Sequence, residues 1–398
     1  MPRVLRILNR LVIGGPSKNA VYLTRYMQPD FETMLVIGGK EDHEQDADFL
    51  ATHHGIEPVV IPEMRRPVSF GSDWIAYKKL KKLINNFRPD IIHTHAAKSG
   101  ALGRMAAKHC DVPIIVHTFH GHVFHSYFNS IKTNFFIRAE RYLANFTDSI
   151  VAISDVQKTE LSERFRIAAG DKFRVIPLGL DLDAFLSDQE TKRKKFRDEF
   201  GLEENTIAIG IIGRLVPVKN HSLFLKGIKA VLENTNRKVK VFIIGDGESR
   251  TAIEQHALVL QIPFSRFPAK DQVLVFTSWR NDVDVICAGL DIIALTSLNE
   301  GTPVSLIEAQ AAGRPVISTR VGGISDVVLE NTSALLSEIS DSKKFSENLL
   351  RLVTDDKLRH SFSNAGRDFV LNKFGHLRLV NDMSKLYHEL LEKKSTKS

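Results

Sequence analysis

The sequence predicts an α/β protein built from two doubly wound domains, each with a parallel sheet covered by helices on both faces. Short buried β-branched segments alternate with helical patterns from the start of the chain, pause near residues 178–200, and then alternate again. This alternation is typical of parallel sheets with helical crossovers. The 398 residues, 43% hydrophobic and 25% charged, suffice for two or three cores of ordinary globular composition.

In the first half of the chain, most of the expected strands lead into a helix. Pro16, directly after Gly14-Gly15, suits the first position of a helix that ends near Met27. Further helices are expected at Asp73–Phe87, Lys98–His109 and around Thr133–Asn145. The expected strands are Val4–Asn9, Thr33–Ile37, Pro58–Ile61, Asp90–His95, Pro113–Thr118 and Ser149–Ile153.

The second half repeats this pattern after a hinge. A polar helix is expected at about Thr191–Phe200, and helices alone from about Ser342. The expected strands are Thr206–Ile212, Lys240–Ile244, Val273–Phe276, Asp291–Thr296 and Pro315–Ser318. We therefore predict an N-terminal domain at 1–180, a second domain at 200–370, and a helix at 371–398 that packs back on the first. The two domains are expected to face each other across a cleft, with ligands at the carboxyl ends of the strands.

Composition excludes several classes of protein. Lys and Arg number 54 against 47 Asp and Glu, a net charge of +7 that suits anionic ligands or an anionic membrane surface, or simply solubility. No nucleic-acid-binding module is recognisable, so no nucleic-acid partner is expected. Cys110 and Cys287 lie far apart and outside any CxxC pair, which favours reduced thiols in the cytoplasm over a disulfide framework or a zinc site. The sequence contains no stretch of 18 apolar residues, so no transmembrane helix is expected.

Cations follow a strand end in the segment IGIIGRLVPVKN, Ile209–Asn220. Gly213 lets the backbone approach a ligand closely, and a helix beginning near Lys219 would supply free N–H groups. Arg214 and Lys219 would then converge on one anion, which suits a diphosphate. The alternative is two surface cations that flank a turn.

Two carboxylates stand eight residues apart in LNEGTPVSLIEAQ, Leu298–Gln310. Glu300 follows a strand and Glu308 lies in the next helix, so their separation is roughly 12 Å along the axis if the segment is helical. That spacing is too wide for the carboxylate pair of a typical glycosidase, and favours a grip on different parts of one extended ligand. The alternative is a helix whose acidic residues stabilise its own dipole.

Glycines and histidines at other strand ends carry weaker signals. Neither Gly14-Gly15 nor Gly245-Asp246-Gly247 continues as GxGxxG, so the dinucleotide-binding fingerprint is absent. The histidines that end two neighbouring strands are His93, His95, His117, His120, His122 and His125. Without HExxH or regular His/Cys spacing, we expect them to hydrogen-bond a donor or acceptor substrate in the cleft rather than to bind a metal.

The helix Asp73–Phe87 is amphipathic. Its apolar residues include Leu80, Leu83 and Ile84 on one face, and four lysines fall opposite, beside Arg65 and Arg66 in the preceding loop. Such a helix packs on its sheet with a solvated outer face, and the basic face additionally suits transient docking to anionic lipid.

Together these motifs resemble the retaining glycosyltransferase family 4, of the GT-B fold. The segments that carry the resemblance are GRLVPVKN, GDG, NEGTPVSLIEAQAAGRPVISTRVGG and the FHG element at Phe119–Gly121, and they span nearly the whole chain. One departure is GTPVSLIEAQ where many members have GLP and EAM, a difference that bears on sugar choice. Asp181-Leu182-Asp183 matches the family's interdomain segment rather than a metal-binding DxD.

The resemblance implies a role for each matching residue. Arg214 and Lys219, with Gly213, would hold the donor pyrophosphate, and Glu308 the ribose. His120 would lie near the reacting face of the sugar. The loop at Gly14 and Gly15 would lie near the phosphates. The sugar would be held by Glu300 and the backbone at Gly301, Thr302, Pro303 and Val304.

The expected activity is therefore transfer of a sugar from a nucleoside diphosphate, most simply UDP, to a glycan or lipid-linked hydroxyl with retention of configuration. No metal or separate cofactor is expected, and capsule, exopolysaccharide or lipopolysaccharide assembly is the implied setting, in the cytoplasm and peripherally at the inner membrane. The alternatives are a sugar-nucleotide epimerase of the same architecture and a catalytically dead sugar-binding protein. An epimerase would alter a UDP-sugar without an acceptor.

Overall fold

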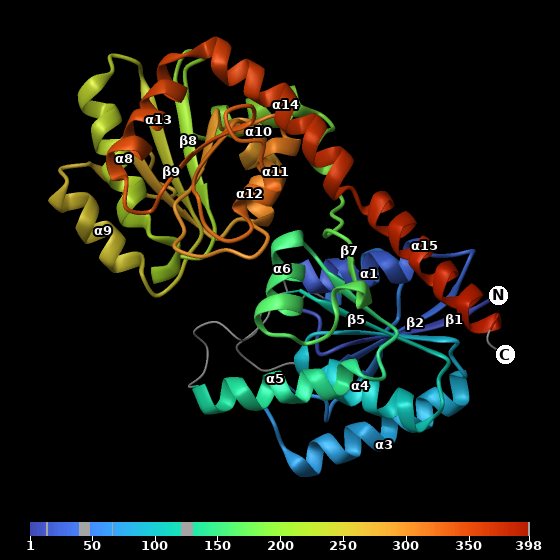
Figure 1. Cartoon of the computed structure of the whole chain (residues 1–398). Helices are drawn as coiled ribbons and strands as arrows, with labels where there is room; N and C mark the ends of the chain where they lie inside the picture. Colours follow the sequence, from blue (N-terminus) through green and yellow to red (C-terminus); the bar gives the residue numbers. More distant parts are fainter. Residues whose placement is uncertain (13–14, 40–47, 66, 121–129, 397–398) are drawn as a thin grey trace. The chain divides into compact units, whose positions relative to one another are not determined.

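A computed structural model describes residues 1–12, 15–39, 48–65, 67–120 and 130–396 (Figure 1). The chain divides into two compact units. Unit 1 comprises Met1–Leu180 and Phe374–Ser398, and unit 2 comprises Asp181–Lys373. Unit 1 is therefore discontinuous in sequence, whereas unit 2 is one continuous segment.

Unit 1 contains a seven-stranded parallel sheet within the described residues, in the order β3-β2-β1-β4-β5-β6-β7. Its strands are β1 (Arg3–Leu8), β2 (Glu32–Gly38), β3 (Val59–Ile61), β4 (Ile91–His95), β5 (Ile114–Phe119), β6 (Ser149–Ala152) and β7 (Phe173–Val175). Its helices include α1 (Gly15–Tyr26), α2 (Asp48–His53), α3 (Phe70–Phe87), α4 (Ala97–His109), α5 (Ser130–Ala144), α6 (Asp155–Thr159) and α15 (His376–Ser395). The strand order reverses between β1 and β4, where ligands of such sheets usually bind.

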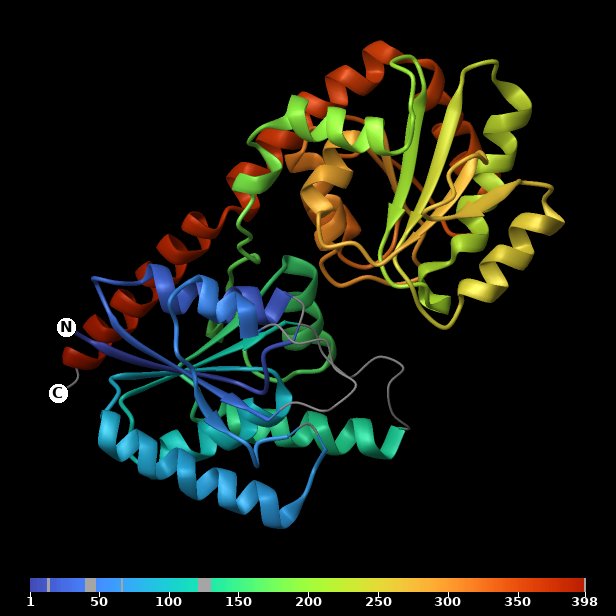
Figure 2. The ribbon, with the colours of Figure 1, turned by 180° about the vertical axis from the view of Figure 1, so that it is seen from behind.

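Helices cover both faces of the unit 1 sheet, as Figure 2 shows from behind. On one face, Leu80 and Ile84 of α3 and Ala106 of α4 pack against the strands. On the other face, α1 and the final helix α15 bury Met383 and Tyr387 against the strands. Burial on both faces explains why these strands read as continuous apolar runs rather than as alternating ones.

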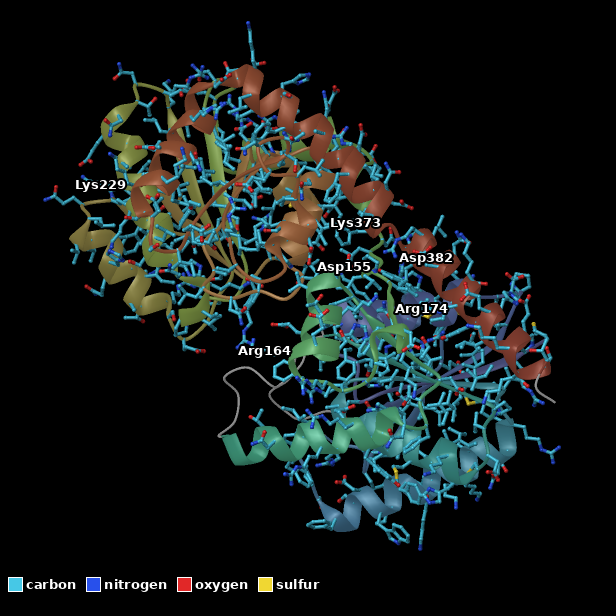
Figure 3. All side chains as sticks on the ribbon, in the orientation of Figure 1. Asp155, Arg164, Arg174, Lys229, Lys373 and Asp382 are labelled. Carbon is cyan, nitrogen blue, oxygen red and sulfur yellow. The ribbon has the colours of Figure 1, made fainter. Side chains whose placement is uncertain are left out.

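The helix α15 is held against the rest of unit 1 by hydrogen bonds as well as by packing of its apolar side chains. The Arg378 guanidinium donates to the carbonyl oxygens of Pro177 and Leu178, at 2.9 and 2.7 Å, and pairs with Asp382 at 3.1 Å. Asp382 is labelled on α15 in Figure 3. At the point where the chain re-enters unit 1, the Leu180 N–H donates to the Phe374 carbonyl at 2.7 Å. The end of the chain is thus an integral part of unit 1.

Unit 2 repeats the architecture with a parallel sheet in the order β10-β11-β9-β8-β12-β13-β14. Its strands are β8 (Ile207–Ile212), β9 (Val239–Ile244), β10 (Phe264–Arg266), β11 (Leu274–Ser278), β12 (Ile292–Leu295), β13 (Val316–Thr319) and β14 (Ala334–Ser337). Its helices include α7 (Gln189–Glu199), α8 (His221–Asn234), α9 (Arg250–Val259), α10 (Val283–Gly289), α11 (Val304–Ala311), α12 (Ile324–Val327), α13 (Ser342–Thr354) and α14 (Asp356–Phe374). The strand order reverses between β8 and β12.

The predicted α/β class and the two parallel sheets are confirmed. Three strands were missed, namely β7, β10 and β14, and each lies at or next to a sheet edge, is three or four residues long and gives almost no periodic signal. The start of α3 was wrong by three residues, because the helix begins at Phe70 rather than at Asp73. No helix in the described part of the chain is long and apolar enough to cross a membrane.

Candidate functional site

The residues of the predicted anion site and Glu300 lie at the same edge of the unit 2 sheet. The loop after β8 carries Gly213, Arg214 and Lys219, and the loop after β12 carries Glu300. Since β8 and β12 are hydrogen-bonded neighbours, their carboxyl ends bring these loops together at the point where the strand order reverses.

The loop after β8 differs from its predicted form in one respect. Lys219 does not open a helix; it closes a short 3-10 turn, Pro217–Lys219, and α8 begins at His221. Arg214 is exposed, whereas the Lys219 side chain is 22% exposed. His221 is buried, and that burial, with the nearby Lys219 charge, lowers its pKa to about 4.

Lys219 and Glu300 form an ion pair that sequence reasoning did not foresee. The Lys219 ammonium lies 2.5 Å from the Glu300 carboxylate, which also accepts from the Ser297 hydroxyl at 2.6 Å. The Thr296 hydroxyl donates to the Lys219 carbonyl at 3.0 Å, and so links the two loops. A cation and a carboxylate held this way offer adjacent contacts for a phosphate oxygen and for a sugar hydroxyl.

Glycines let neighbouring loops support this edge by direct backbone packing. A Cβ on Gly245, at φ +135°, would lie 1.9 Å from the Gly213 carbonyl oxygen. A Cβ on Gly322, at φ +48°, would lie 2.0 Å from the Glu300 carbonyl oxygen. The GDG segment thus packs against the Gly213 loop, and the VGG segment packs against the Glu300 loop. The short motifs alone do not reveal this structural role.

Glu308 lies in α11, apart from the loop that carries Glu300. The helix begins at Val304, with Pro303 as its N-terminal flanking residue, so Gly301 and Thr302 belong to the preceding loop. Glu308 is half-buried, and its charge adds to burial in raising the pKa of the Cys287 thiol. Gly301 is exposed, and no atom would contact a Cβ placed on it. The loop thus leaves backbone exposed just ahead of α11.

In unit 1, two of the predicted ligand-binding histidines are instead internal. The buried His93 contacts the Tyr387 hydroxyl through Nδ1 at 2.6 Å and the Thr118 hydroxyl through Nε2 at 2.7 Å. His117, also buried, contacts the Thr94 hydroxyl through Nδ1 at 2.8 Å. The expectation that both line a cleft is therefore wrong, because the strand ends turn these side chains into the helical layers.

His95 and His120 instead contact each other. The Nδ1 of His95 lies 2.9 Å from the Nε2 of His120, and their rings stack at 5.1 Å between centroids. Burial lowers the pKa of His120 to about 3 and that of His95 well below its ordinary value, so both rings are neutral at pH 7. The pair ends the neighbouring strands β4 and β5, beside the reversal of strand order in unit 1.

Some predicted residues lie outside the described part of the chain, namely Gly14, Arg66, His122 and His125. Gly15 is the first residue of α1, where a Cβ would lie 3.2 Å from Leu178. Within the described ranges, no cluster of three His, Cys, Asp or Glu side chains is placed to hold a metal ion.

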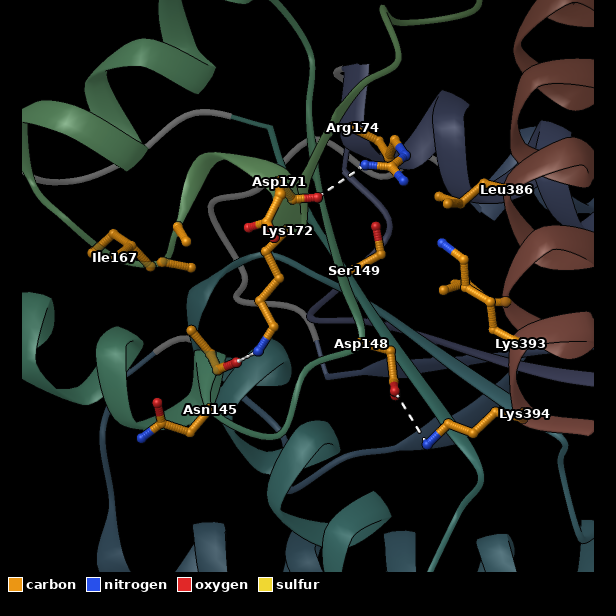
Figure 4. Close-up of a pocket in the computed structure, with 14 residues that line it drawn as sticks. Asn145, Asp148, Ser149, Ile167, Asp171, Lys172, Arg174, Leu386, Lys393 and Lys394 are labelled. Carbon is orange, nitrogen blue, oxygen red and sulfur yellow. Dashed lines mark hydrogen bonds and ion pairs between the residues drawn. The ribbon is translucent and has the colours of Figure 1, made fainter. Parts of the chain in front are cut away.

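A separate hollow of about 500 Å³ lies in unit 1 between β6, β7 and the end of α15 (Figure 4). Asp148 and Lys394 meet across it at 3.2 Å, and Lys172 donates to the Ala144 carbonyl at 2.5 Å. Asp148 and Lys172 directly precede β6 and β7, so the hollow is at the amino edge of the sheet, opposite His95 and His120.

Known protein families match both units. The family described as Glycosyl transferases group 1 matches residues 192–369, and Glycosyltransferase Family 4 matches residues 13–184. Two doubly wound parallel sheets with these matches define a glycosyltransferase of the GT-B fold. The chain belongs to glycosyltransferase family 4, as the sequence motifs had indicated.

Individual relatives agree with this assignment. The chain is 30% identical over 338 residues, 84% of each chain, to the UDP-Gal:α-D-GlcNAc-diphosphoundecaprenol α-1,3-galactosyltransferase of Escherichia coli. It is 24% identical to the capsular polysaccharide biosynthesis glycosyltransferase CapM of Staphylococcus aureus, over 85% of this chain and 86% of that one. The crystal structure of Anabaena HepE in complex with UDP shares the fold, with a TM-score of 0.80 at 17% identity over 98% of this chain and all of that one. None of these points to an epimerase.

Proposed function

We propose that this protein transfers a hexose from a UDP-hexose to a hydroxyl of a lipid-linked glycan, with retention of the α configuration and without a metal ion, during assembly of a surface polysaccharide. The Lys219–Glu300 pair at the carboxyl edge of β8 and β12 supports this assignment most directly. Lys219 and Arg214 would take the diphosphate, Glu300 and the backbone at Gly301–Val304 the sugar, and Glu308 the ribose.

Positioning and electrostatics would supply the catalysis. As the bond from C1 to the diphosphate breaks, negative charge grows on the leaving oxygen, and preorganised cations stabilise it best at that moment. The new C1–O bond forms on the same face, and a donor phosphate oxygen accepts the proton of the acceptor hydroxyl. The cations of the site would then take the role that a metal ion plays in other transferases.

Donor and acceptor classes follow from the relatives. The Escherichia coli relative is named for UDP-Gal, for an acceptor in which a sugar is linked through diphosphate to a lipid, and for an α linkage. The Anabaena neighbour was crystallised with UDP and with UDP-glucose. A UDP-hexose and a sugar-diphospholipid are therefore the substrates to test first.

The first prediction is the outcome of the reaction. Purified protein, a UDP-hexose and a GlcNAc-diphospholipid acceptor should give an α-linked product, and excess EDTA should not abolish transfer. The small coupling of the product's anomeric proton in NMR identifies the α linkage. A β-linked product would contradict retention, dependence on added Mg²⁺ would contradict the metal-free mechanism, and epimerisation of the UDP-sugar without acceptor would contradict transfer itself.

A membrane-facing surface would bring the protein to such an acceptor. Four exposed apolar side chains gather at the start of α3 and are here termed the α3 patch, comprising Val68, Phe70, Trp74 and Ile75. Phe70 is 92% exposed and Trp74 57%. Lys78 lies over the Trp74 ring at 5.1 Å, so apolar and basic groups are interleaved. Apolar side chains beside lysines suit an anionic lipid interface.

Topology places the α3 patch at the sheet edge that carries His95 and His120. Lys98, three residues after the end of β4, donates to the Pro67 carbonyl and pairs with Asp73 in the first turn of α3. The lysine face predicted from sequence is partly neutralised, since Lys79 pairs with Glu63 at 2.6 Å. The exposed apolar end, rather than the lysine row alone, is the feature that favours docking.

The second prediction tests this surface by liposome co-sedimentation. The wild-type protein should bind vesicles that contain anionic lipid, and Phe70→Ser with Trp74→Ser should remove most of that binding. Each lysine near the surface contributes about 1 kcal/mol, so salt should weaken binding. Leu258→Ser with Val259→Ser, at an exposed apolar pair on α9, is the matched control. Docking is refuted if binding is indifferent to anionic lipid, or if both double variants bind equally.

A further inference from the structure

The hollow at the amino edge of the unit 1 sheet is lined by more cations than carboxylates. Its volume is about 500 Å³, and it lies between β6, β7 and the end of α15 (Figure 4). Four cations against two carboxylates leave its lining with a net charge of +2. The charged residues of the lining are Asp148, Asp171, Lys172, Arg174, Lys393 and Lys394. The hollow is therefore suited to an anion.

Two of the four cations are held in place by contacts within unit 1. Lys394 pairs with Asp148 at 3.2 Å, and the same carboxylate accepts from the Ile115 N–H at 2.8 Å. Lys172 donates to the Ala144 carbonyl at 2.5 Å. A carbonyl oxygen does not neutralise an ammonium group, so Lys172 still contributes its positive charge, whereas Asp148 and Lys394 balance each other.

The other two cations, Arg174 and Lys393, keep free hydrogen-bond donors. Arg174 donates through Nη1 to the carbonyl oxygens of Asp171 and Phe173, at 3.0 and 3.3 Å. Among the described residues, its Nε and Nη2 have no partner, and the Lys393 ammonium has none either. Figure 4 shows this ammonium directed from α15 into the hollow, toward the strand that begins at Ser149. Both cations can therefore donate to a ligand.

Lys393 does not serve to cap the helix that carries it. Lysines near the end of a helix can donate to its last carbonyl oxygens. Here the Ser395 hydroxyl donates to the Glu392 carbonyl at 2.8 Å, and the Thr396 hydroxyl donates to the Lys393 carbonyl at 3.2 Å. Because hydroxyl groups make these contacts, the Lys393 ammonium is available to a ligand.

The charge of the hollow matches that of a phosphate monoester. A monoester carries about −1.5 to −2 at pH 7, close to the opposite of the net charge of the lining. A carboxylate or a phosphodiester carries only about −1. Guanidinium and ammonium donors are the groups that bind phosphate oxygens most strongly in proteins. The free donors of Arg174 and Lys393 fit this ligand.

The position of the hollow favours a soluble ligand over a lipid headgroup. The hollow lies at the amino edge of the sheet, whereas the α3 patch lies at the carboxyl edge, so a membrane that contacts the patch is at the other end of the strands. Part of the lining is apolar, namely Ile167, Leu386 and Leu390. Walls of low dielectric strengthen the field of the cations, and the volume suits a small organic phosphate.

We propose that this hollow binds a soluble phosphate monoester, whose phosphate group contacts Arg174 and Lys393. The ligand joins β7 to the last helix of the chain, and thereby stabilises the docking of α15 in unit 1. The site is separate from the Lys219–Glu300 pair of unit 2. The inference goes beyond the proposed sugar transfer and does not depend on it.

Methyl phosphate and dimethyl phosphate are matched probes, because they differ by one methyl group and one charge. In isothermal titration calorimetry at pH 7, the full-length protein should bind methyl phosphate, and dimethyl phosphate at least about tenfold more weakly. Arg174→Gln with Lys393→Gln should weaken methyl phosphate binding by at least about tenfold, since charged hydrogen bonds are lost. Lys357→Gln with Lys385→Gln removes two exposed cations outside the hollow and should leave the affinity unchanged.

Lys393→Gln alone guards against misfolding, because this exposed side chain has no partner within the described residues. It should weaken binding about tenfold with an unchanged circular dichroism spectrum. The inference is overturned if methyl phosphate does not bind, if the wild type and the Arg174/Lys393 double variant bind it equally, or if Lys219→Ala abolishes binding. Loss of vesicle binding in that double variant would assign the hollow to a lipid headgroup instead. Failure of sugar transfer would not affect this measurement, which needs neither donor nor acceptor.

Discussion

Replacing Lys219 or Arg214 with alanine is expected to lower kcat on the order of 100-fold each, the loss typical for one preorganised donor to a developing anion. The interaction strengthens as the diphosphate departs, so the effect appears in turnover at saturating donor rather than in KM alone. Lys219→Ala also leaves Glu300 with the Ser297 hydroxyl as its remaining partner in this loop, so its donor KM should rise as well. Steady-state kinetics with a UDP-hexose measure both parameters.

Two controls make this result specific. Lys226→Ala removes an exposed cation from α8, a few residues beyond the site, and should leave kcat unchanged. Glu308→Ala should raise the donor KM more than it lowers kcat, because the ribose does not change charge during the reaction. Near-normal turnover in well-folded Lys219→Ala and Arg214→Ala would mean that the leaving group is not stabilised at this edge of the sheet.

The second large effect is expected from Gly245→Ala. The new methyl group would meet the Gly213 carbonyl oxygen at 1.9 Å, and the backbone has φ +135°. Overpacking and backbone strain each cost about 1–3 kcal/mol, so unit 2 should lose about 2–6 kcal/mol of its free energy of unfolding. The displaced Gly213 loop should also weaken UDP binding, which a thermal shift with UDP detects.

Urea unfolding can isolate this effect to unit 2. The chain has two tryptophans, Trp74 in unit 1 and Trp279 in unit 2, so a Trp74→Phe background reports unit 2 alone. Gly201→Ala is the matched control, because Gly201 has φ +61° but no atom within 4 Å of its would-be Cβ. It should cost only about 1–2 kcal/mol, the strain of a left-handed residue. If both variants lose the same free energy of unfolding, the Gly213 loop moves away from the new methyl group at no cost.

The arrangement of the candidate site could be predicted from the sequence where its residues are close together in the chain. Strand, glycine and cation follow one another at Gly213–Lys219, and the parallel sheet then dictates which loops meet. The Lys219–Glu300 pair joins residues 81 positions apart, and periodicity carries no signal for it. Only the known adjacency of β8 and β12 would have revealed it.

The partners of the histidines could not be predicted from the sequence, because two histidines on the same strand contact different parts of the structure. His93 and His95 are two residues apart on one strand, yet His93 is committed to Tyr387, 294 positions away, while His95 meets His120. The different partners of His93 and His95 depend on α15, which carries Tyr387. The apolar face of α15 does not by itself indicate which sheet the helix packs against. Similarly, the α3 patch begins before the predicted start of its helix, where the first turn projects from the domain rather than onto its sheet.

The discontinuity of unit 1 has a consequence for synthesis on the ribosome. Unit 2 is complete once Lys373 has emerged, whereas the sheet of unit 1, made first, waits for the last helix to be translated. Until then Arg6 and His93 lack Tyr387, and the face that will bury Leu379 and Met383 stays open. The N-terminal half of the nascent chain must therefore remain unfinished while the C-terminal half folds, so premature termination shortly before α15 yields a native unit 2 attached to an incomplete unit 1.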